Sequence, residues 1–334
     1  YAIILARSDC MKIGKLPNSL LNKIVLEPIN KYSIDREEVL VKPSIGEDCS
    51  ALTIDDNICL LSTDPITGAV ADIGKLAVHI NSNDIAAGGG EPIGIMVTAL
   101  LPPTITEEEI QKIITDVYTQ AKEVNMCVLG GHTEITDAVV KPVLSCTVIG
   151  KSKRLIASSG AKAGDDLVMT KYAGLEGTSI FASDKIEKLK NVSENTLSEA
   201  RELSKLLSVV KEGKIASQMG ANAMHDVTEG GILGACWEVA TCSGLGVEVY
   251  ADKIPVLDCT KQICSELGVN PLRLISSGSM VIAIENSEEL VAELAKNGIN
   301  ATVIGKFTSD GLYIVNKGEK QVLEEPDVDE LYKL

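Results

Sequence analysis

Aromatic side chains are scarce in this chain of 334 residues, where Phe, Trp and Tyr together make up only 3%. The core must therefore be built from aliphatic residues. Basic residues are also in deficit, with 31 Lys and Arg against 47 Asp and Glu and a formal net charge of −16. An acidic chain without a basic run is a poor candidate for binding nucleic acid or an anionic membrane. No apolar run reaches the roughly 20 residues of a membrane-spanning helix, so we expect no membrane partner.

Cysteine pairs with the C-x-x-C spacing are absent, although the chain has nine cysteines. The odd count argues against a complete disulfide framework. Most of the cysteines lie in apolar stretches, so we expect buried thiols in a reducing compartment and a cytoplasmic location.

Several familiar catalytic motifs are missing as well. Without G-x-x-x-x-G-K-[ST] or G-x-G-x-x-G, the chain has neither a P-loop nor a dinucleotide-binding turn. Without H-E-x-x-H, and with three histidines at no zinc spacing, it is not a zinc protease. The absence of G-x-S-x-G excludes the usual nucleophile elbow of the α/β-hydrolases.

The length predicts two domains. Residues 1–10 are expected to be a non-native or disordered leader, because Met11 opens "MKIGKLP" in the manner of a natural start. Residues 11–152 mix β-hairpins with crossover helices, which is an α+β pattern, and one of these helices is expected over about residues 72–87. A polar, Gly- and Ser-rich stretch then forms a linker, and residues 163–334 alternate strands and helices as an α/β domain. We expect one long helical region over about 178–219 and an acidic C-terminal tail on the surface.

Carboxylates beside glycine or small polar residues recur where predicted elements end. They are Glu47, Asp48, Asp64, Asp84, Glu134, Asp226 and Glu229. Any one of them taken singly is more often a turn or cap residue than a ligand. Carboxylates that converge from different strand ends are, however, how proteins bind Mg²⁺, which prefers oxygen ligands and retains water and phosphate. The set therefore suggests a site for magnesium and ATP.

Glycines next to these acids could let backbone N–H groups reach phosphate oxygens. The candidates are Gly88–Gly90, Gly130-Gly131 and Gly230-Gly231, the last at the start of a predicted helix. Asp84 lies in "HINSNDIAAGGGEP", where a buried charge needs a cation or hydrogen bonds, although it could simply cap its own turn. Other residues also keep two interpretations: Lys75 as phosphate contact or solvated lysine, His132 as base or loop residue, and Glu229 as ligand or helix cap.

Four segments together resemble one family: "GEDCS", "STDPITGAVADIGKLAVHINSNDIAAGGGEP", "GGHTEIT" and "HDVTEGG". Their order and spacing are similar to those of the AIR synthase (PurM-like) superfamily, most of all its hydrogenase-maturation branch, the carbamoyl dehydratase HypE. The resemblance extends from about Met11 to Val315. It implies a PurM-like N-terminal domain with a dimer-forming β-sheet, an AIR-synthase-type C-terminal α/β domain, and a homodimer with MgATP in a cleft near the dimer interface.

The resemblance also implies roles for individual residues. Metal binding falls to Asp48, Asp64, Asp84 and Asp226. Nucleotide binding falls to Lys75, Asn83, Gly130, Gly131, Thr133 and Glu134. Catalytic roles fall to Asp84, Asp226 and His132. The implied chemistry is ATP-dependent phosphorylation of an amide- or carbamoyl-type oxygen, followed by loss of phosphate.

The chain departs from the branch on the acceptor side. The dehydratase ends in a Pro-Arg-Ile-Cys tail, whereas this sequence ends "DELYKL" and its last cysteine is Cys264. Ser277, in "NPLRLISSGS", stands where the branch typically has an acidic residue before glycine. We therefore expect an intact nucleotide half, a small-molecule or carbamoyl-type acceptor, and a protein partner in a maturation complex.

Other functions stay open at this point. A nucleotide-binding scaffold or sensor dimer would need no acceptor. Within the superfamily, thiamine-monophosphate kinase is disfavoured by Glu47 and His132, which replace its aspartates. Selenophosphate synthetase carries a reactive N-terminal cysteine, for which Cys10 is the candidate, and AIR synthase itself is a further alternative.

Overall fold

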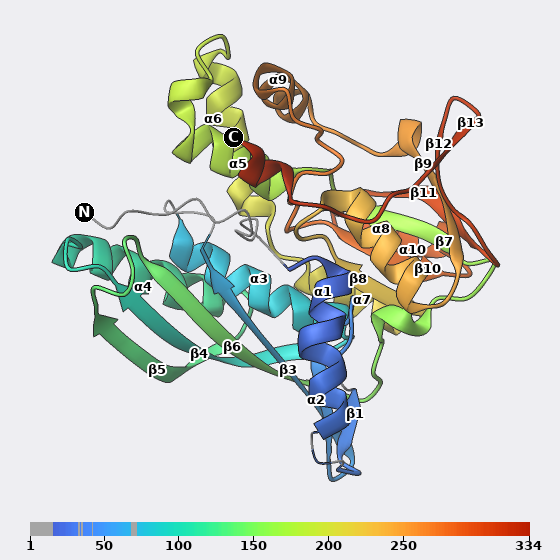
Figure 1. The fold of residues 1–334 in the computed structure, drawn as a ribbon, viewed down its shortest axis with the longest axis horizontal. Coiled ribbons are helices and arrows are strands. Elements are labelled where there is room, and N and C mark those ends of the chain that lie inside the picture. The colour runs from blue at the N-terminus through green and yellow to red at the C-terminus, as the bar shows by residue number, and fades with distance from the viewer. Residues whose placement is uncertain (1–15, 33, 35, 42, 68–71) are drawn as a thin grey trace.

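The computed structural model describes residues 16–32, 34, 36–41, 43–67 and 72–334, so the predicted leader at residues 1–10 lies outside it. Two β-sheets organise the described chain, one in each half, and helices pack against both (Figure 1). The first half is α+β and the second is a mixed α/β unit, as predicted from the sequence.

The N-terminal sheet has six strands in the order β1-β2-β3-β6-β4-β5. The strands are β1 (Val39–Val41), β2 (Ser50–Ile54), β3 (Asn57–Ile66), β4 (Glu91–Leu101), β5 (Cys127–Ile135) and β6 (Val143–Ser152). Neighbouring strands are antiparallel except β4 and β5, which are parallel. Buried residues alternate with more exposed ones along β6, as in a sheet with one face in the core.

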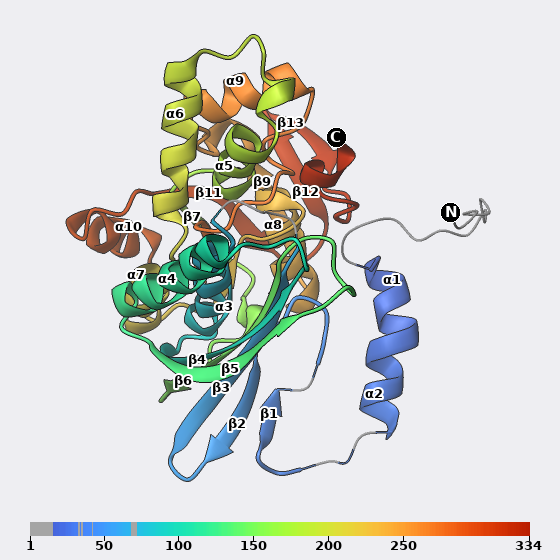
Figure 2. The same cartoon turned by 90° about the vertical axis from the view of Figure 1, so that its left-hand side faces the viewer.

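Two helices, α3 (Ile73–Ala87) and α4 (Glu107–Glu123), cover one face of this sheet (Figure 1). The predicted capping box is confirmed at the start of α4, where Thr106 and Glu109 bond each other's backbone. On the other face, Ile93 and Met96 of β4 are exposed. A rod of α1 (Asn18–Leu21), η1 (Asn22–Leu26) and α2 (Glu27–Tyr32) lies outside both sheets (Figure 2).

The C-terminal sheet has seven strands in the order β13-β12-β9-β11-β7-β10-β8. The strands are β7 (Asp166–Thr170), β8 (Ala223–Asp226), β9 (Gly246–Tyr250), β10 (Met280–Ile284), β11 (Ala301–Thr308), β12 (Leu312–Asn316) and β13 (Glu319–Val322). Its pairs are antiparallel except β12 with β9. The α-helices are α5 (Leu175–Asp184), α6 (Glu194–Glu202), α7 (Val210–Gln218), α8 (Gly231–Cys242), α9 (Asp258–Leu267) and α10 (Ser287–Lys296). The 3₁₀ turns are η2 (Ser158–Gly160), η3 (Ile186–Lys188), η4 (Leu203–Leu206), η5 (Ala251–Lys253) and η6 (Glu330–Lys333).

The long helical region expected over about residues 178–219 is not continuous, because that stretch is divided among α5, α6 and α7. Ser193 begins α6 by accepting a hydrogen bond from the backbone N–H of Thr196. Before α7, the carbonyl of Leu207 and the N–H of Val209 are bonded to the side chain of Asn83 instead of to a helix. Tertiary contacts therefore override the local helical pattern.

The surface position expected for the acidic tail is also wrong in part. Asp329 is only 3% exposed, and Leu331 joins the hydrophobic core. The Oδ2 atom of Asp329 accepts a hydrogen bond of 2.7 Å from the backbone N–H of Gly230, at the N-terminus of α8. A carboxylate is favoured there by the helix dipole, which compensates part of the cost of burying it.

Helix α3 lies between the two halves of the molecule. It contacts β3, β4 and β6 of the N-terminal sheet and also α7 and β8 of the C-terminal half. Asn83, which is fully buried, joins them: Nδ2 donates to the carbonyl of Leu207 at 2.8 Å, and Oδ1 accepts from the N–H of Val209 at 2.8 Å. Both polar ends of this amide are thus used to hold the two halves together.

Asn83→Ala should lower the free energy of unfolding by about 2 to 4 kcal/mol, because it leaves a buried carbonyl and a buried N–H without partners. Ser82→Ala is the matched control, since Ser82 is equally buried but bonds only the carbonyl of His79 in its own helix. Urea denaturation of both variants measures the difference. Equal losses in the two variants would contradict the role of Asn83 as the link between the halves.

Candidate active site

A cleft of about 860 Å³ has walls from both halves of the chain, and we call it the acidic cleft. Eight carboxylates line it, against two lysines and one histidine. The carboxylates belong to Glu47, Asp48, Asp64, Asp84, Asp184, Asp226, Glu229 and Glu238. This balance favours a cation, or a cation with an anionic ligand, over a free anion.

Asp84 reaches the cleft from the buried interior of α3. It is 4% exposed, and its Oδ2 atom accepts a hydrogen bond from the hydroxyl of Ser62 in β3. Burial raises the pKa of Asp84 well above its ordinary value, and the nearby charges of Asp226, Asp64 and Asp48 raise it further. The alternative that Asp84 only caps its own helix turn is therefore wrong, because its carboxylate bonds a different element and shares a space with three other acids.

The backbone of Asp64 is held by a hydrogen bond to α3. Its N–H donates to Oδ1 of Asn81 at 2.8 Å, and Nδ2 of Asn81 donates to the carbonyl of Ala77 at 2.9 Å. Asn81 is fully buried in α3, so it fastens the end of β3 to the same helix that carries Asp84. The side chain of Asp64 is consequently directed into the cleft from a fixed strand.

Asp48 and Asp226 enter from the other side of the cleft, together with His225. Nδ1 of His225 lies 2.5 Å from Oδ1 of Asp48, and Nε2 lies 3.0 Å from Oε2 of Glu238. Burial alone would lower the pKa of His225, but Asp48 and Glu238 outweigh it and raise the pKa well above its usual value. A histidine with both ring nitrogens engaged is a poor metal ligand, so it acts here as a cation that orients Asp48.

Asp226 ends β8 and is 1% exposed. One oxygen each of Asp48 and Asp226 and one nitrogen of His225 lie within 4.8 Å of one another. The register of β8 against β10, which pairs Asp226 with Met280, fixes the position of this strand end. Asp64 and Asp84 line the same cleft, so all four aspartates to which the family resemblance gives a metal-binding role border it.

Comparison with known proteins places this site in a family. The N-terminal domain of AIR synthase related proteins matches residues 46–152, and the C-terminal domain of the same proteins matches residues 162–317. The chain belongs to the AIR synthase related proteins. The two matched regions contain all four aspartates of the cleft.

The relatives of this AIR synthase related protein have several activities. It is 28% identical over 312 residues to a protein of Methanocaldococcus jannaschii named for hydrogenase expression/formation, with 89% of each chain covered. It is 26% identical to the selenide, water dikinase of Methanococcus maripaludis, covering 93% of this chain and 97% of the relative. It is 24% identical to the carbamoyl dehydratase HypE of Escherichia coli, covering 96% of both.

Solved structures share the fold. The HypE–HypF complex has a TM-score of 0.74 at 21% identity, covering 91% of this chain and 100% of the other. ThiL complexed with AMPPCP and TMP has a TM-score of 0.73 at 19% identity, covering 92% and 97%. HypE in complex with ATP has a TM-score of 0.68 at 17% identity, covering 96% and 98%. The predicted PurM-like fold, close to HypE, is confirmed.

The residues predicted to contact the nucleotide do not all lie at the cleft of this AIR synthase related protein. Gly130, Gly131, His132, Thr133 and Glu134 lie on β5, an edge strand whose residues are all exposed. Nε2 of His132 lies 3.5 Å from Oε2 of Glu134. These five residues reach no carboxylate of the cleft within the described chain, so their nucleotide role stays a prediction that a second copy would have to complete.

Two other predicted nucleotide contacts have different partners. Asn83 uses both ends of its amide to bind the backbone at Leu207 and Val209, which leaves it no free group for a nucleotide. Nζ of Lys75 lies 3.4 Å from the hydroxyl of Ser204 and 3.8 Å from Asp72, away from the four aspartates. Neither residue lines the acidic cleft.

The glycine candidates also serve packing. A Cβ at Gly88 would lie 2.7 Å from Sγ of Cys49, and a Cβ at Gly90 would lie 2.4 Å from Leu60, so these glycines let α3 approach its neighbours. Gly230 donates its N–H to Asp329, so a carboxylate of the chain itself already occupies the helix end that the sequence suggested for phosphate. Gly131 has a φ of +150°, and a Cβ there would lie 1.8 Å from the carbonyl oxygen of Val97.

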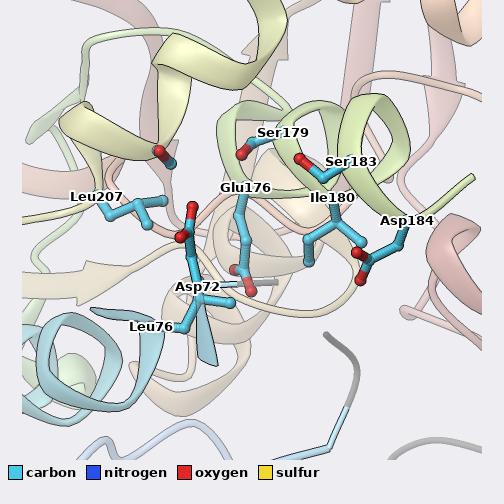
Figure 3. Close-up of a pocket in the computed structure, with 9 residues that line it drawn as sticks. Asp72, Leu76, Glu176, Ser179, Ile180, Ser183, Asp184 and Leu207 are labelled. Carbon is cyan, nitrogen blue, oxygen red and sulfur yellow. The ribbon is translucent and has the colours of Figure 1, made fainter. Parts of the chain in front are cut away.

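Three functional side chains escaped the sequence analysis: His225, Glu238 and Glu176. His225 lies directly before Asp226 in "HDVTEGG", and that adjacency was its only signal. Glu176 is 4% exposed at the start of α5 and lines a second, small cavity of about 10 Å³ (Figure 3). Nothing in "GLEGT" distinguishes it from an ordinary acidic residue in the first turn of a helix.

Acidic neighbours surround Glu176. Burial raises its pKa to about 7 from the ordinary 4.5; Ser277 opposes the rise, while Glu229 and Asp329 add to it. Asp72 and Asp184 line the same small cavity. Because the folded-state pKa lies above the unfolded value, the stabilisation from the protonated form is complete below about pH 4.5 and is lost as the pH rises through about 7.

Glu176→Gln should therefore make stability less dependent on pH. At about pH 8 the variant should be more stable than the wild type, by on the order of 3 kcal/mol, while at about pH 5 the two should differ little. Urea denaturation at both pH values measures this. If both proteins lose the same stability between the two conditions, Glu176 titrates as an ordinary exposed acid.

Proposed function

We propose that the protein is an ATP- and Mg²⁺-dependent enzyme that activates an amide- or carbamoyl-type oxygen by phosphoryl transfer. One observation carries the proposal: four aspartates from separate elements of both halves line the acidic cleft, where the charges of three of them act on Asp84. The volume of this cleft is within the usual range for ligand pockets. The names of two relatives support the proposal, since one is a selenide, water dikinase and the other a carbamoyl dehydratase.

The donor set fits magnesium. Asp48, Asp64, Asp84 and Asp226 offer carboxylate oxygens, the ligand type that a hard divalent cation prefers. Burial and the nearby charges of Asp226, Asp64 and Asp48 raise the pKa of Asp84, so a cation at this position would favour its charged form. When bound, Mg²⁺ supplies charge neutralisation at the phosphates of ATP.

The remaining work falls to residues of the chain. Phosphoryl transfer needs positioning and electrostatic stabilisation more than covalent help from the protein. Ser62 and Asn81 hold Asp84 and Asp64 on fixed elements, and His225 orients Asp48. This support keeps the carboxylates in place against their mutual repulsion.

The exposed edge of the N-terminal sheet supports the proposal of a homodimer. Strand β5 has no neighbour on its outer edge among the described residues, and all of its residues are exposed, with Leu129 54% and Ile135 53% exposed. An exposed apolar edge strand is a ready template for another chain. We propose that two copies join through this sheet and that each β5 carries Gly130, His132 and Glu134 to the cleft of the other copy, which completes the nucleotide site.

The acceptor in this proposal is a small amide or carbamoyl-type molecule, and a protein partner from a maturation complex delivers or receives it. The HypE–HypF complex, which shares the fold, supports such a partner. The eight cysteines of the described chain are all free, which fits a reducing cytoplasm. Within the described residues, no helix combines the length and the apolarity needed to cross a bilayer.

Asp84→Asn tests the magnesium–nucleotide site. The variant should bind MgATP at least about 10-fold more weakly and lose turnover about 100-fold or more, because a ligand charge is gone. It should also unfold at a higher urea concentration, because it removes an unfavourable buried charge. Calorimetric titration, ADP release and denaturation give the three values, with Asp56→Asn in the exposed β2–β3 turn as the control.

The outcome separates the enzyme from the scaffold. Wild-type protein that binds MgATP tightly but releases no ADP with any amide offered would favour a nucleotide-binding scaffold or sensor. Wild-type protein that gives no heat with MgATP would remove both interpretations.

Met96→Glu tests the dimer. Met96 is 48% exposed on the open face of the N-terminal sheet, so a charge there should convert a dimer of 35.4-kDa chains into monomers and lower turnover, since β5 would no longer reach the second cleft. Ile186→Glu is the matched control, with 46% exposure in η3, outside that sheet. Light scattering after gel filtration measures the mass. An unchanged mass for Met96→Glu would rule out this interface.

A further inference from the structure

The acceptor side of the cleft contains a buried carboxyl that no sequence motif marks. Glu176, Ile180 and Asp184 are spaced four residues apart on α5, and their side chains project to the same side of the helix (Figure 3). Ile180 and Asp184 line both the acidic cleft and the small cavity. Glu176 lines only the small cavity, which has room for about one water molecule. It is therefore one layer behind the wall of the acidic cleft.

Ser277 forms the part of that wall next to Glu176. The residues around it are fixed on α5: Oγ of Ser276 accepts from the N–H of Gly174 at 2.8 Å, and the carbonyl of Ile275 accepts from the N–H of Gly177 at 3.0 Å. Ser279 donates its hydroxyl to the carbonyl of Tyr172 at 2.6 Å. Two of the three serines thus have structural hydrogen bonds, whereas Ser277 faces the cleft.

Ser277 and Glu176 each keep a polar atom unsatisfied. Ser277 is fully buried and Glu176 is 4% exposed. The hydroxyl of Ser277 lies close enough to favour the charged form of Glu176, yet its geometry leaves Oγ of Ser277 and Oε2 of Glu176 without a well-formed hydrogen bond among the described residues. Burying such atoms costs about 1 to 3 kcal/mol each, so packing alone would favour an apolar or amide side chain here. The arrangement is instead one that a bound ligand would complete.

We propose that Ser277 and Glu176 together take a proton from the substrate that accepts the phosphoryl group. Ser277 touches this substrate, and Glu176 lies behind Ser277 as a positioning residue that holds the proton. This inference rests on the proposed phosphoryl transfer. It also accounts for the serine at position 277, where the HypE branch typically has an acidic residue: here Glu176 of α5 supplies the carboxyl. The substrate class is a molecule whose amide or carbamoyl N–H must be deprotonated.

The step balances as follows for such a substrate. A bond forms between the carbonyl oxygen and the γ-phosphorus, while the bond from that phosphorus to the bridging oxygen breaks and ADP leaves with the electron pair. The nitrogen loses one proton to Oγ of Ser277 as the hydroxyl proton of Ser277 passes to the carboxylate of Glu176. Glu176 then releases the proton to solvent; its pKa of about 7 suits such an exchange near neutral pH.

The test measures ADP release from MgATP with S-carbamoylcysteine as the probe, alongside the affinity for Mg-AMPPCP. Glu176→Gln and Ser277→Ala should each lower turnover by about 100-fold while nucleotide affinity changes less than about twofold. The double variant should be no slower than the slower single variant, because the two groups act as one unit. Glu187→Gln, the same change at an exposed residue of η3, is the control.

A rescue experiment adds a result that a merely structural role would not produce. Ser277→Asp should slow the wild type, because it places a second carboxylate against Glu176, but it should raise turnover at least about tenfold in the Glu176→Gln background. The proposed pairing of Ser277 with Glu176 would be overturned if the losses of turnover in the two single variants multiply in the double variant. It would also be overturned if the turnover of each single variant stays within twofold of wild type. Those outcomes leave phosphoryl transfer standing, whereas nucleotide binding without ADP release in the wild type would overturn both.

Discussion

Four aspartates line one cleft, and the charges of three of them make the ionised state of the fourth, Asp84, less favourable. Burial and the charges of Asp226, Asp64 and Asp48 all raise the pKa of Asp84. Such a cluster opposes folding unless something compensates it, and one protonated histidine beside Asp48 is the compensation that the chain provides there. In the proposed function a divalent cation would relieve this state, and the binding free energy of that cation would add to the stability of the folded form.

The support for this strained arrangement comes mainly from α3. Its polar run "HINSND" lies in a helix that is buried on nearly every side, and each side chain has a separate partner. His79 bonds Gln120 of α4, Asn81 holds the end of β3, and Asn83 holds the segment before α7. Asp84 is the polar member of the run that lines the cleft. Rigid placement by its neighbours is what allows a buried carboxylate to keep a defined position.

Sequence reasoning included the four aspartates in a set of seven acids, because a charge next to glycine or a small polar residue at an element end is visible in the sequence, and the family resemblance then selected the four. It assigned Asn83 to the nucleotide because one motif contains both residues that line the site and residues that join the two halves. Only the hydrogen-bond partner of each side chain in the folded protein distinguishes these two kinds of residue. The roles of β5 and Lys75 depend on which surfaces meet, and α7 begins where a side chain from another half captures the backbone. Tertiary contacts of this kind leave no local pattern, so the helical period alone predicted one long helix where three occur.

The acceptor side shows the same limit more sharply. Compared position by position, Ser277 is a lost carboxylate, and the loss suggests an inactive protein. In the folded protein, the loop that carries Ser277 is hydrogen-bonded to the start of α5. The carboxyl of Glu176, in the first turn of that helix, therefore lies next to Ser277. A reaction needs a group of the right pKa at the right point, whichever segment supplies it. A single substitution within a motif is therefore weak evidence for lost activity until the buried ionisable groups around it have been located, and in this protein Glu176 is such a group.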